Sequence, residues 1–253
     1  MQYKSTILMN PSLKLLAFIL LIFAISTACT SGKKTLTSTG DIEVITINSD
    51  ESGIPIEVIF RKGTAHNHPL MAIWLEDMDG NYLETLYVAK SIGSGIFGHG
   101  IVKKGHWEPG PVSRPAALPY WWHKYGELPN PESPVPDAIS GPTPDGDFIL
   151  KTKAESHEKD MVNILFEINQ SWDWNEYWTN DKYPDNEDYK TSSQPAVVYQ
   201  ASIDLSAPGR VYELKIIGHS HYAGEDGSLT TDIGTLTTAL EIVGVIKVST
   251  GVK

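Results

Sequence analysis

The segment MAIWLEDMDGNYLETLYV, residues 71–88, holds two runs of apolar, β-branched and aromatic residues separated by a polar turn. The turn, MDGN at residues 78–81, contains Asp-Gly, and this dipeptide between apolar runs is a strong local signal for a β-hairpin. The segment therefore predicts two antiparallel strands, at residues 70–77 and 82–90.

The rest of the chain repeats this pattern of short runs rich in β-branched and aromatic residues. Seven further strands are predicted, at residues 42–47, 54–60, 148–154, 162–169, 197–205, 211–218 and 240–248. Long amphipathic periodicity of the helical kind is hard to find. We therefore expect an all-β fold, an antiparallel β-sandwich with long irregular loops and little helix. Within TTDIGTLTTAL, residues 230–240, the sequence allows one helical turn.

Two connections, residues 91–146 and 170–196, are much longer than ordinary loops, and loops of such length are usually functional or disordered. The first contains GSGIFG at residues 93–98, which satisfies the glycine pattern of dinucleotide-binding proteins. That pattern requires a helix directly after the glycines, whereas HGIVKKGHWEPGP follows here. We interpret this stretch as a glycine-rich surface loop.

The amino-terminal segment has the features of an export signal. Lys4 and Lys14 precede eleven apolar residues, 15–25, which are too few to cross a bilayer about 30 Å thick as a helix but are typical of a signal peptide. Cys29, the only cysteine, follows three small residues. This placement predicts a lipid attachment site rather than a thiol nucleophile.

These features divide the chain into three parts. We expect a signal peptide at residues 1–28, a lipidated cysteine and flexible tether at residues 29–40, and a single β-sandwich domain at residues 41–253. Removing the signal peptide takes away two lysines and no acid, so the formal charge falls from −11 to −13. We expect no nucleic-acid partner for so acidic a chain. The expected location is the cell envelope, on the periplasmic side or at the outer membrane.

Several blocks of sequence, taken together and in their order, resemble a known family. They are the hairpin segment, RPAALPYWWHKYG at 114–126, PDAISGPTP at 136–144, QPAVVYQASID at 194–204, and GHSHYAGEDGSLTTDIGTLTTAL at 218–240. Over roughly residues 55–248 the chain resembles the predicted periplasmic proteins called domain of unknown function 2271. The resemblance implies an exported protein whose partners are a flavin transferase and membrane redox proteins of the PepSY type. It implies no enzymatic activity.

Within that resemblance, DAISGPT is similar to the flavinylation motif D-x-x-[S/T]-G-A-[S/T]. In the motif a transferase attaches FMN through its phosphate to the last hydroxyl, which implies Thr143 as the acceptor of covalent FMN, together with Asp137, Ser140 and Gly141. Gly141 leaves clearance around the backbone, and Asp137 can hold the turn through backbone amides. Pro142 stands where the motif has alanine and removes one amide donor. The alternative is an ordinary turn, which Asp, Gly and Pro all favour.

Two groups of aromatic residues lie in the long connections. They are Tyr120, Trp121 and Trp122 in the first, and Trp172, Trp174 and Trp178 in the second. Exposed rings of this kind can stack on a flavin or on sugars. Adjacent tryptophans on a strand face opposite sides, so we expect at least one of Trp121 and Trp122 in the core. For the second group we favour packing beneath the loop.

Two His-x-His pairs, His66 with His68 and His219 with His221, are the remaining candidates for chemistry. On a strand this spacing places both imidazoles on one face, where they could share copper or zinc. Histidines also occur at positions 99, 106, 123 and 157, without a pattern. We favour hydrogen-bonded structural histidines for the pairs, and the sequence assigns no metal. The acidic run at residues 181–189 lacks the spacing of a calcium loop and is expected to be solvated.

Three hypotheses for function follow. The first is an exported lipoprotein, held to a membrane by its lipid, that takes part in extracytoplasmic flavin-linked electron transfer and carries FMN on Thr143. The second is a non-catalytic envelope module that binds carbohydrate or a protein ligand. The third is a structural envelope protein. No catalytic signature of a hydrolase, metalloprotease or phosphate loop occurs, so we do not expect an enzyme.

Overall fold

A computed structural model gives the fold of residues 42–48, 52–136, 140–141, 143–157 and 159–251. The predicted signal peptide, Cys29 and the tether lie outside these described residues, as do Asp137 and Pro142. Ile42–Lys253 form one compact unit. None of its described helices has the length and apolar character needed to cross a membrane.

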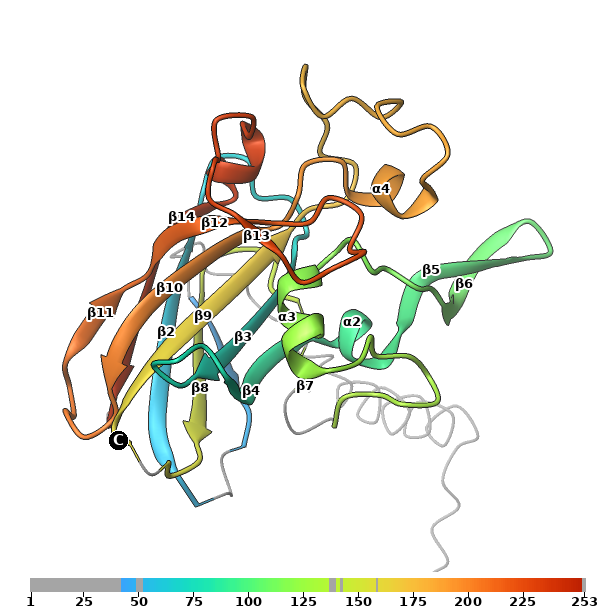
Figure 1. The fold of residues 1–253 in the computed structure, drawn as a ribbon. Helices are drawn as coiled ribbons and strands as arrows, with labels where there is room; N and C mark the ends of the chain where they lie inside the picture. Colours follow the sequence, from blue (N-terminus) through green and yellow to red (C-terminus); the bar gives the residue numbers. More distant parts are fainter. Residues whose placement is uncertain (1–41, 49–51, 137–139, 142, 158, 252–253) are drawn as a thin grey trace, which may run out of the picture. The chain divides into compact units, whose positions relative to one another are not determined.

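The described strands form two large sheets and one two-stranded sheet (Figure 1). The five-stranded sheet has the order β1 (Glu43–Thr46), β8 (Phe148–Ala154), β2 (Ile54–Lys62), β14 (Val243–Thr250) and β11 (Val211–Glu213). The seven-stranded sheet has the order β13 (Leu229–Thr230), β12 (Lys215–Ser220), β10 (Val197–Asp204), β9 (Met161–Asn169), β3 (Leu70–Glu76), β4 (Tyr82–Ala89) and β7 (Ser140–Gly141). The predicted all-β class is confirmed. The prediction of purely antiparallel sheets is wrong at two pairs, β1 with β8 and β4 with β7, which are parallel.

Side chains between the two large sheets form the main core. Figure 1 shows these sheets face to face, with β2 and β8 behind β3 and β9. Because alternate residues of a strand point to the same side, Met71, Ile73 and Leu75 of β3 all enter this core. Opposite them, the rings of Phe60 and Phe148 stack with their centroids 4.8 Å apart.

Every residue of β3 is buried, because the other face of the strand is covered as well. Ala72 and Trp74 pack in a second cluster with Leu118 and Trp121, at the start of α3 (Pro119–Tyr125). This double burial explains why β3 has an almost continuous apolar sequence rather than a strict alternation of apolar and polar residues.

The β3–β4 hairpin predicted from Asp-Gly is present, with an irregular pairing. The carboxylate of Asp77 organises its turn by accepting hydrogen bonds from the backbone N–H groups of Asp79 and Asn81, both at 2.9 Å. Gly80 adopts the left-handed conformation with φ of 84°, which favours glycine. The turn thus extends from Asp77 to Asn81.

One predicted strand, residues 211–218, is two strands that belong to different sheets. β11 pairs with β14 and β12 pairs with β10. Leu214, between them, is buried and its N–H donates to the carbonyl of Ile246 at 3.0 Å. The chain crosses from one sheet to the other at this residue, a step that hydrophobic periodicity alone does not reveal.

The long connections contain elements that the sequence did not predict. They are α2 (Lys90–Ser94), β5 (Ile96–Lys103), β6 (His106–Pro111), α3 and β7 in the first connection, and α4 (Glu187–Ser192) in the second. GSGIFG is not a surface loop: it covers the end of α2, a left-handed glycine at position 95, and the start of β5. The predicted helical turn within residues 230–240 is confirmed as the 3-10 helix η1 (Thr238–Glu241).

Candidate functional site

Two described residues of the stretch that resembles the flavinylation motif lie in an edge strand. Ser140 and Gly141 form β7, which pairs in parallel with Val88 and Ala89 of β4, and both residues are buried. A Cβ atom on Gly141 would lie 2.8 Å from Cε2 of the buried Tyr87 ring. Glycine is therefore required here by close packing as well as by the motif.

Thr143 follows β7 and is partly exposed, in contrast to the buried Ser140. Within the described part of the chain its hydroxyl has no hydrogen-bonding partner. Pro144, the next residue, is buried. The chain therefore presents a partly exposed hydroxyl directly before a buried proline.

Asp147 fixes the other end of this segment, which we call the 140–147 loop. Its carboxylate accepts a hydrogen bond from Nη1 of Arg61 and another from the backbone N–H of Lys62, each at 2.9 Å. These contacts, with the backbone hydrogen bond first, lower the pKa of Asp147 below its ordinary value. The loop is thus attached to the end of β2 before the chain enters β8.

The first His-x-His pair lies beside this loop, although the two are far apart in sequence. His68 places Nε2 at 3.3 Å from the carboxylate of Asp145 on the exposed surface. Burial lowers the pKa of His66, while the carbonyls of Ile242 and Pro144 act against this effect. Neither carbonyl is in hydrogen-bonding geometry, and both ring nitrogens of His66 are buried without a described partner. A hydrogen-bonded structural role for His66 therefore stays a prediction.

The second pair lies elsewhere, at the end of β12. His219 is buried with Nδ1 at 2.8 Å from the carbonyl of Ser220. Nδ1 of His221 accepts from the backbone N–H groups of Ala223 and Glu225, both at 3.3 Å, and so stabilises the following turn. His221 therefore carries its proton on Nε2 when neutral. Both imidazoles serve local structure.

The aromatic groups divide between core and surface. Trp121 is fully buried, which confirms that at least one of Trp121 and Trp122 lies in the core. Its ring stacks on that of Tyr125, with the centroids 5.4 Å apart. Trp178 is also buried, but Trp172 and Trp174 are 59% and 51% exposed, so the prediction of packing beneath the loop is wrong for these two residues. The prediction treated Trp121 as a strand residue, whereas it belongs to α3.

A cavity of about 300 Å³ lies among the aromatic residues near α4. Its lining includes Tyr177, Trp178, His221 and Tyr222. Nζ of Lys182 lies 3.1 Å from the centroid of the Tyr177 ring. This cavity joins the second histidine pair to the second aromatic group.

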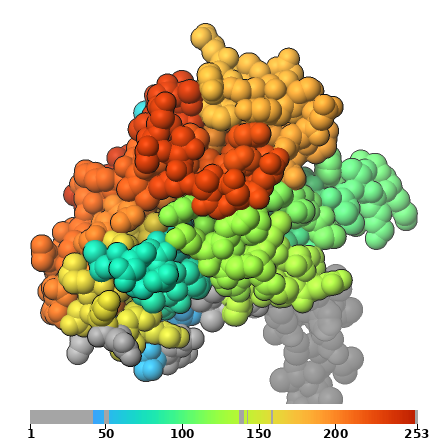
Figure 2. Space-filling model, viewed as in Figure 1, coloured from blue at the N-terminus to red at the C-terminus, as the bar shows by residue number. Residues whose placement is uncertain are grey.

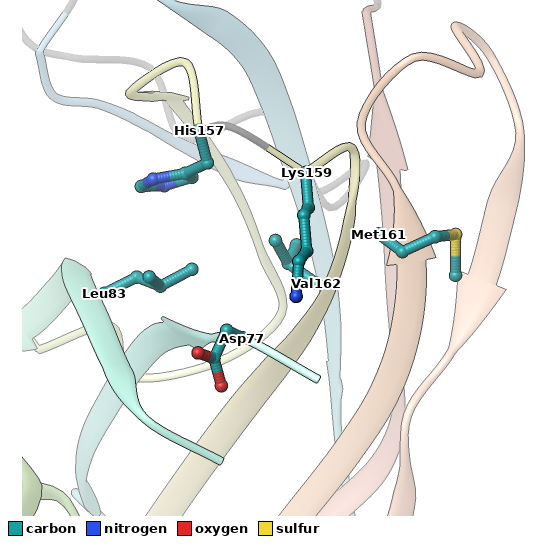
Figure 3. A pocket seen from close by; sticks show the side chains of 6 residues that line it. All are labelled: Asp77, Leu83, His157, Lys159, Met161 and Val162. Atoms are coloured by element: carbon teal, nitrogen blue, oxygen red, sulfur yellow. The ribbon is translucent and has the colours of Figure 1, made fainter. Parts of the chain in front are cut away.

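Another cavity, of about 310 Å³, lies near the β3–β4 turn (Figure 3). Asp77 and Lys159 both line it, and Lys159 contributes to lowering the pKa of Asp77, after the hydrogen bonds from Asn81. His157 in its wall is paired with Glu84 at 2.9 Å. Asp77 is already hydrogen-bonded within the turn, and His157 is already paired with Glu84. The cavity therefore offers few polar groups that are free to bind a ligand.

Comparisons of the chain with protein-family models, with curated proteins and with solved structures find no match. Within the described ranges, no group of three or more His, Cys, Asp or Glu side chains is placed to hold a metal ion. The 140–147 loop provides a partly exposed hydroxyl at Thr143, and the same loop contacts Arg61 and Lys62 through Asp147 and His68 through Asp145. No sequence signal links residues 66–68 to this loop, because only the folded chain brings them together.

Proposed function

We propose that this chain is an exported lipoprotein that carries FMN as a phosphoester on Thr143 and takes part in extracytoplasmic flavin-linked electron transfer. The observation that carries the proposal is the placement of Thr143, a partly exposed hydroxyl between the paired strand β7 and the anchor at Asp147. Ser140, the other hydroxyl of the motif, is buried and is a poorer substrate for a second protein.

An acceptor of this kind needs little chemistry of its own. The transferase supplies a flavin dinucleotide. Oγ1 of Thr143 forms the new bond to the phosphorus on the flavin side, the pyrophosphate bond breaks so that AMP leaves, and the hydroxyl proton passes to a base of the transferase. The phosphoester then carries negative charge on a loop whose far end, at Asp147, contacts the guanidinium of Arg61. The anchored loop keeps the acceptor in place for the transferase.

Two rings of the first aromatic group, those of Trp121 and Trp122, already pack against other residues of the chain. Trp121 is in the core, and the Trp122 ring stacks on His123 with centroids 3.5 Å apart. We therefore expect the attached flavin to remain accessible to a redox partner, such as a membrane redox protein of the PepSY type. A carrier that exchanges electrons with other proteins requires this accessibility.

In-gel fluorescence after coexpression with a flavin transferase tests the attachment. The wild-type band should fluoresce after denaturation, because a covalent phosphoester survives unfolding. Thr143→Val removes the hydroxyl, keeps the β-branched shape, and should abolish the band, whereas Thr143→Ser should keep it. Thr64→Val, which removes an exposed hydroxyl that donates to Glu241, is the matched control and should label normally.

Pro142→Ala supplies the amide donor and the residue usual in the motif. If docking by the transferase limits the reaction, this variant should be labelled more completely than wild type. Equal labelling of Thr143→Val and wild type would contradict Thr143 as the acceptor. An unlabelled wild-type chain, beside a known acceptor that is labelled, would contradict flavin attachment.

The aromatic cavity favours a second candidate function, the binding of an envelope carbohydrate. Tyr177 is 52% exposed at its edge, and exposed aromatic rings stack on sugars. Titration with soluble oligosaccharides, followed by tryptophan fluorescence, tests this candidate. Tyr177→Ala should weaken binding and Val211→Ala, at an exposed position of β11, should not; no response in wild type counts against the candidate.

A further inference from the structure

β5 and β6 form a sheet of their own, which we call the arm, residues 96–111. Figures 1 and 2 show the arm projecting from the rest of the domain. At its base Phe97 packs against the second cluster of buried residues, the one that contains Trp74 and Trp121. The guanidinium of Arg114 lies 5.3 Å from the centroid of the Phe97 ring. The base is therefore fixed, while the tip extends away from both large sheets.

The tip of the arm exposes apolar side chains in an ordered hairpin. Lys104 and Gly105 form its two-residue turn, both with positive φ, at 51° and 81°. Val102 and Trp107 are directly opposite each other in the register and so lie on one face of the ribbon. They are 61% and 62% exposed. Leaving a Val–Trp pair in water is unfavourable, which indicates that another surface covers it.

The charge of the arm is opposite to that of the chain. Residues 96–111 contain two lysines, Lys103 and Lys104, and one acid, Glu108, whereas the whole chain has a formal charge of −11. Oε2 of Glu108 lies 3.6 Å from Nζ of Lys103, so this acid is paired with one of the two lysines. An anionic surface would therefore repel the body of the domain and attract the tip of the arm.

We propose that the tip of the arm inserts into the headgroup region of an anionic phospholipid bilayer. Tryptophan is the side chain that best suits the boundary between lipid and water, and Val102 adds apolar area beside it. Lys103 and Lys104 meet the lipid phosphates at the same depth. The proposal concerns a second membrane contact and depends neither on lipidation of Cys29 nor on FMN.

Vesicle binding by residues 42–253 tests the proposal without any lipid anchor, since this compact unit contains both cores. The unit should sediment with vesicles of phosphatidylglycerol and phosphatidylcholine, less so in high salt, and little with phosphatidylcholine alone. Lys103→Gln with Lys104→Gln should weaken binding by about fivefold for each lysine removed. Acyl chains carrying bromine should quench the emission of Trp107, and Trp107→Phe should lose that quenching.

Matched controls separate the arm from the rest of the surface. Lys215→Gln with Lys247→Gln removes two exposed lysines of the body, and Trp174→Phe alters an exposed tryptophan elsewhere; both variants should bind as wild type does. The lysine variants leave the Val102–Trp107 pair intact, so they test the proposal even where Trp107→Phe loosens the hairpin. No binding of wild type to anionic vesicles, or equal loss in arm and control variants, overturns the proposal and leaves the free strand edges for a protein partner.

Discussion

Glu167 is a fully buried acid that caps a helix from another part of the chain. The residue before α3, Leu118, provides no side-chain cap. The carboxylate of Glu167 on β9 instead accepts the backbone N–H groups of Tyr120 at 3.1 Å and Trp121 at 2.7 Å. Burial raises the pKa of Glu167 to about 8, even though these N–H groups lower it.

This raised pKa makes stability depend on pH in a stated direction. Between the ordinary value of 4.5 and about 8, the folded chain holds a proton that the unfolded chain has lost. The contribution of this bound proton to the free energy of unfolding is fully present below about pH 4.5. It is lost as pH rises toward 8, by at most about 1.4 kcal/mol per pH unit. Glu167→Gln, which cannot titrate, should lose less stability over this range in urea unfolding. Parallel pH profiles for variant and wild type would contradict this explanation.

At the residue scale, the sequence identifies a candidate residue more readily than it predicts which other residues surround it in the fold. The motif around Thr143 can be recognised without a structure, because its spacing is local. Two residues that contact that loop, His68 and Arg61, lie more than 70 positions away in the chain. Their proximity depends on the pairing of β2 with β8, which local patterns do not encode.

At the scale of elements, β7 joins the candidate acceptor to the sheet. It has only two residues, and its position depends on contact between Gly141 and the buried ring of Tyr87. Such a short strand escapes prediction because it has no periodicity of its own. The longer strands were predicted with bounds close to those observed, since buried apolar residues recur along their length.

Gly141→Ala should therefore destabilise the domain. The added methyl group would lie 2.8 Å from the Tyr87 ring, and overpacking of this kind costs about 1–3 kcal/mol. Gly146→Ala is the control in the same loop, because nothing lies within 4 Å of its added Cβ. Urea unfolding should show a loss for Gly141→Ala alone, and equal midpoints for the two variants would contradict the packing argument.

At the scale of the whole molecule, the all-β class could be predicted from the sequence. The arrangement of the strands in two large sheets, with two cores, could not. Alternation and turn residues predict strands and a sandwich. They do not predict that the chain changes sheets at Leu214, or that a hairpin projects as the arm. Both features depend on contacts between segments distant in sequence.

The proposed attachment of the chain to a membrane through Cys29 also concerns the whole molecule. After a high-salt wash, which removes protein held by charge alone, we expect wild type to stay in the membrane fraction until detergent is added. Cys29→Ala should be released by the wash, because it lacks the lipid, whereas Ser31→Ala in the tether should stay bound. A Cys29→Ala variant that resists the wash would contradict lipid anchoring.

The central claim is that Thr143 carries FMN, and intact mass of the mature chain coexpressed with a flavin transferase tests it most directly. We predict a species heavier by one FMN less one water, with the added mass located by peptide mapping on the peptide that contains Thr143. Thr143→Val should show the unmodified mass alone. An unmodified wild-type chain in cells where a known acceptor is labelled, or an added mass on a peptide without Thr143, would contradict the claim.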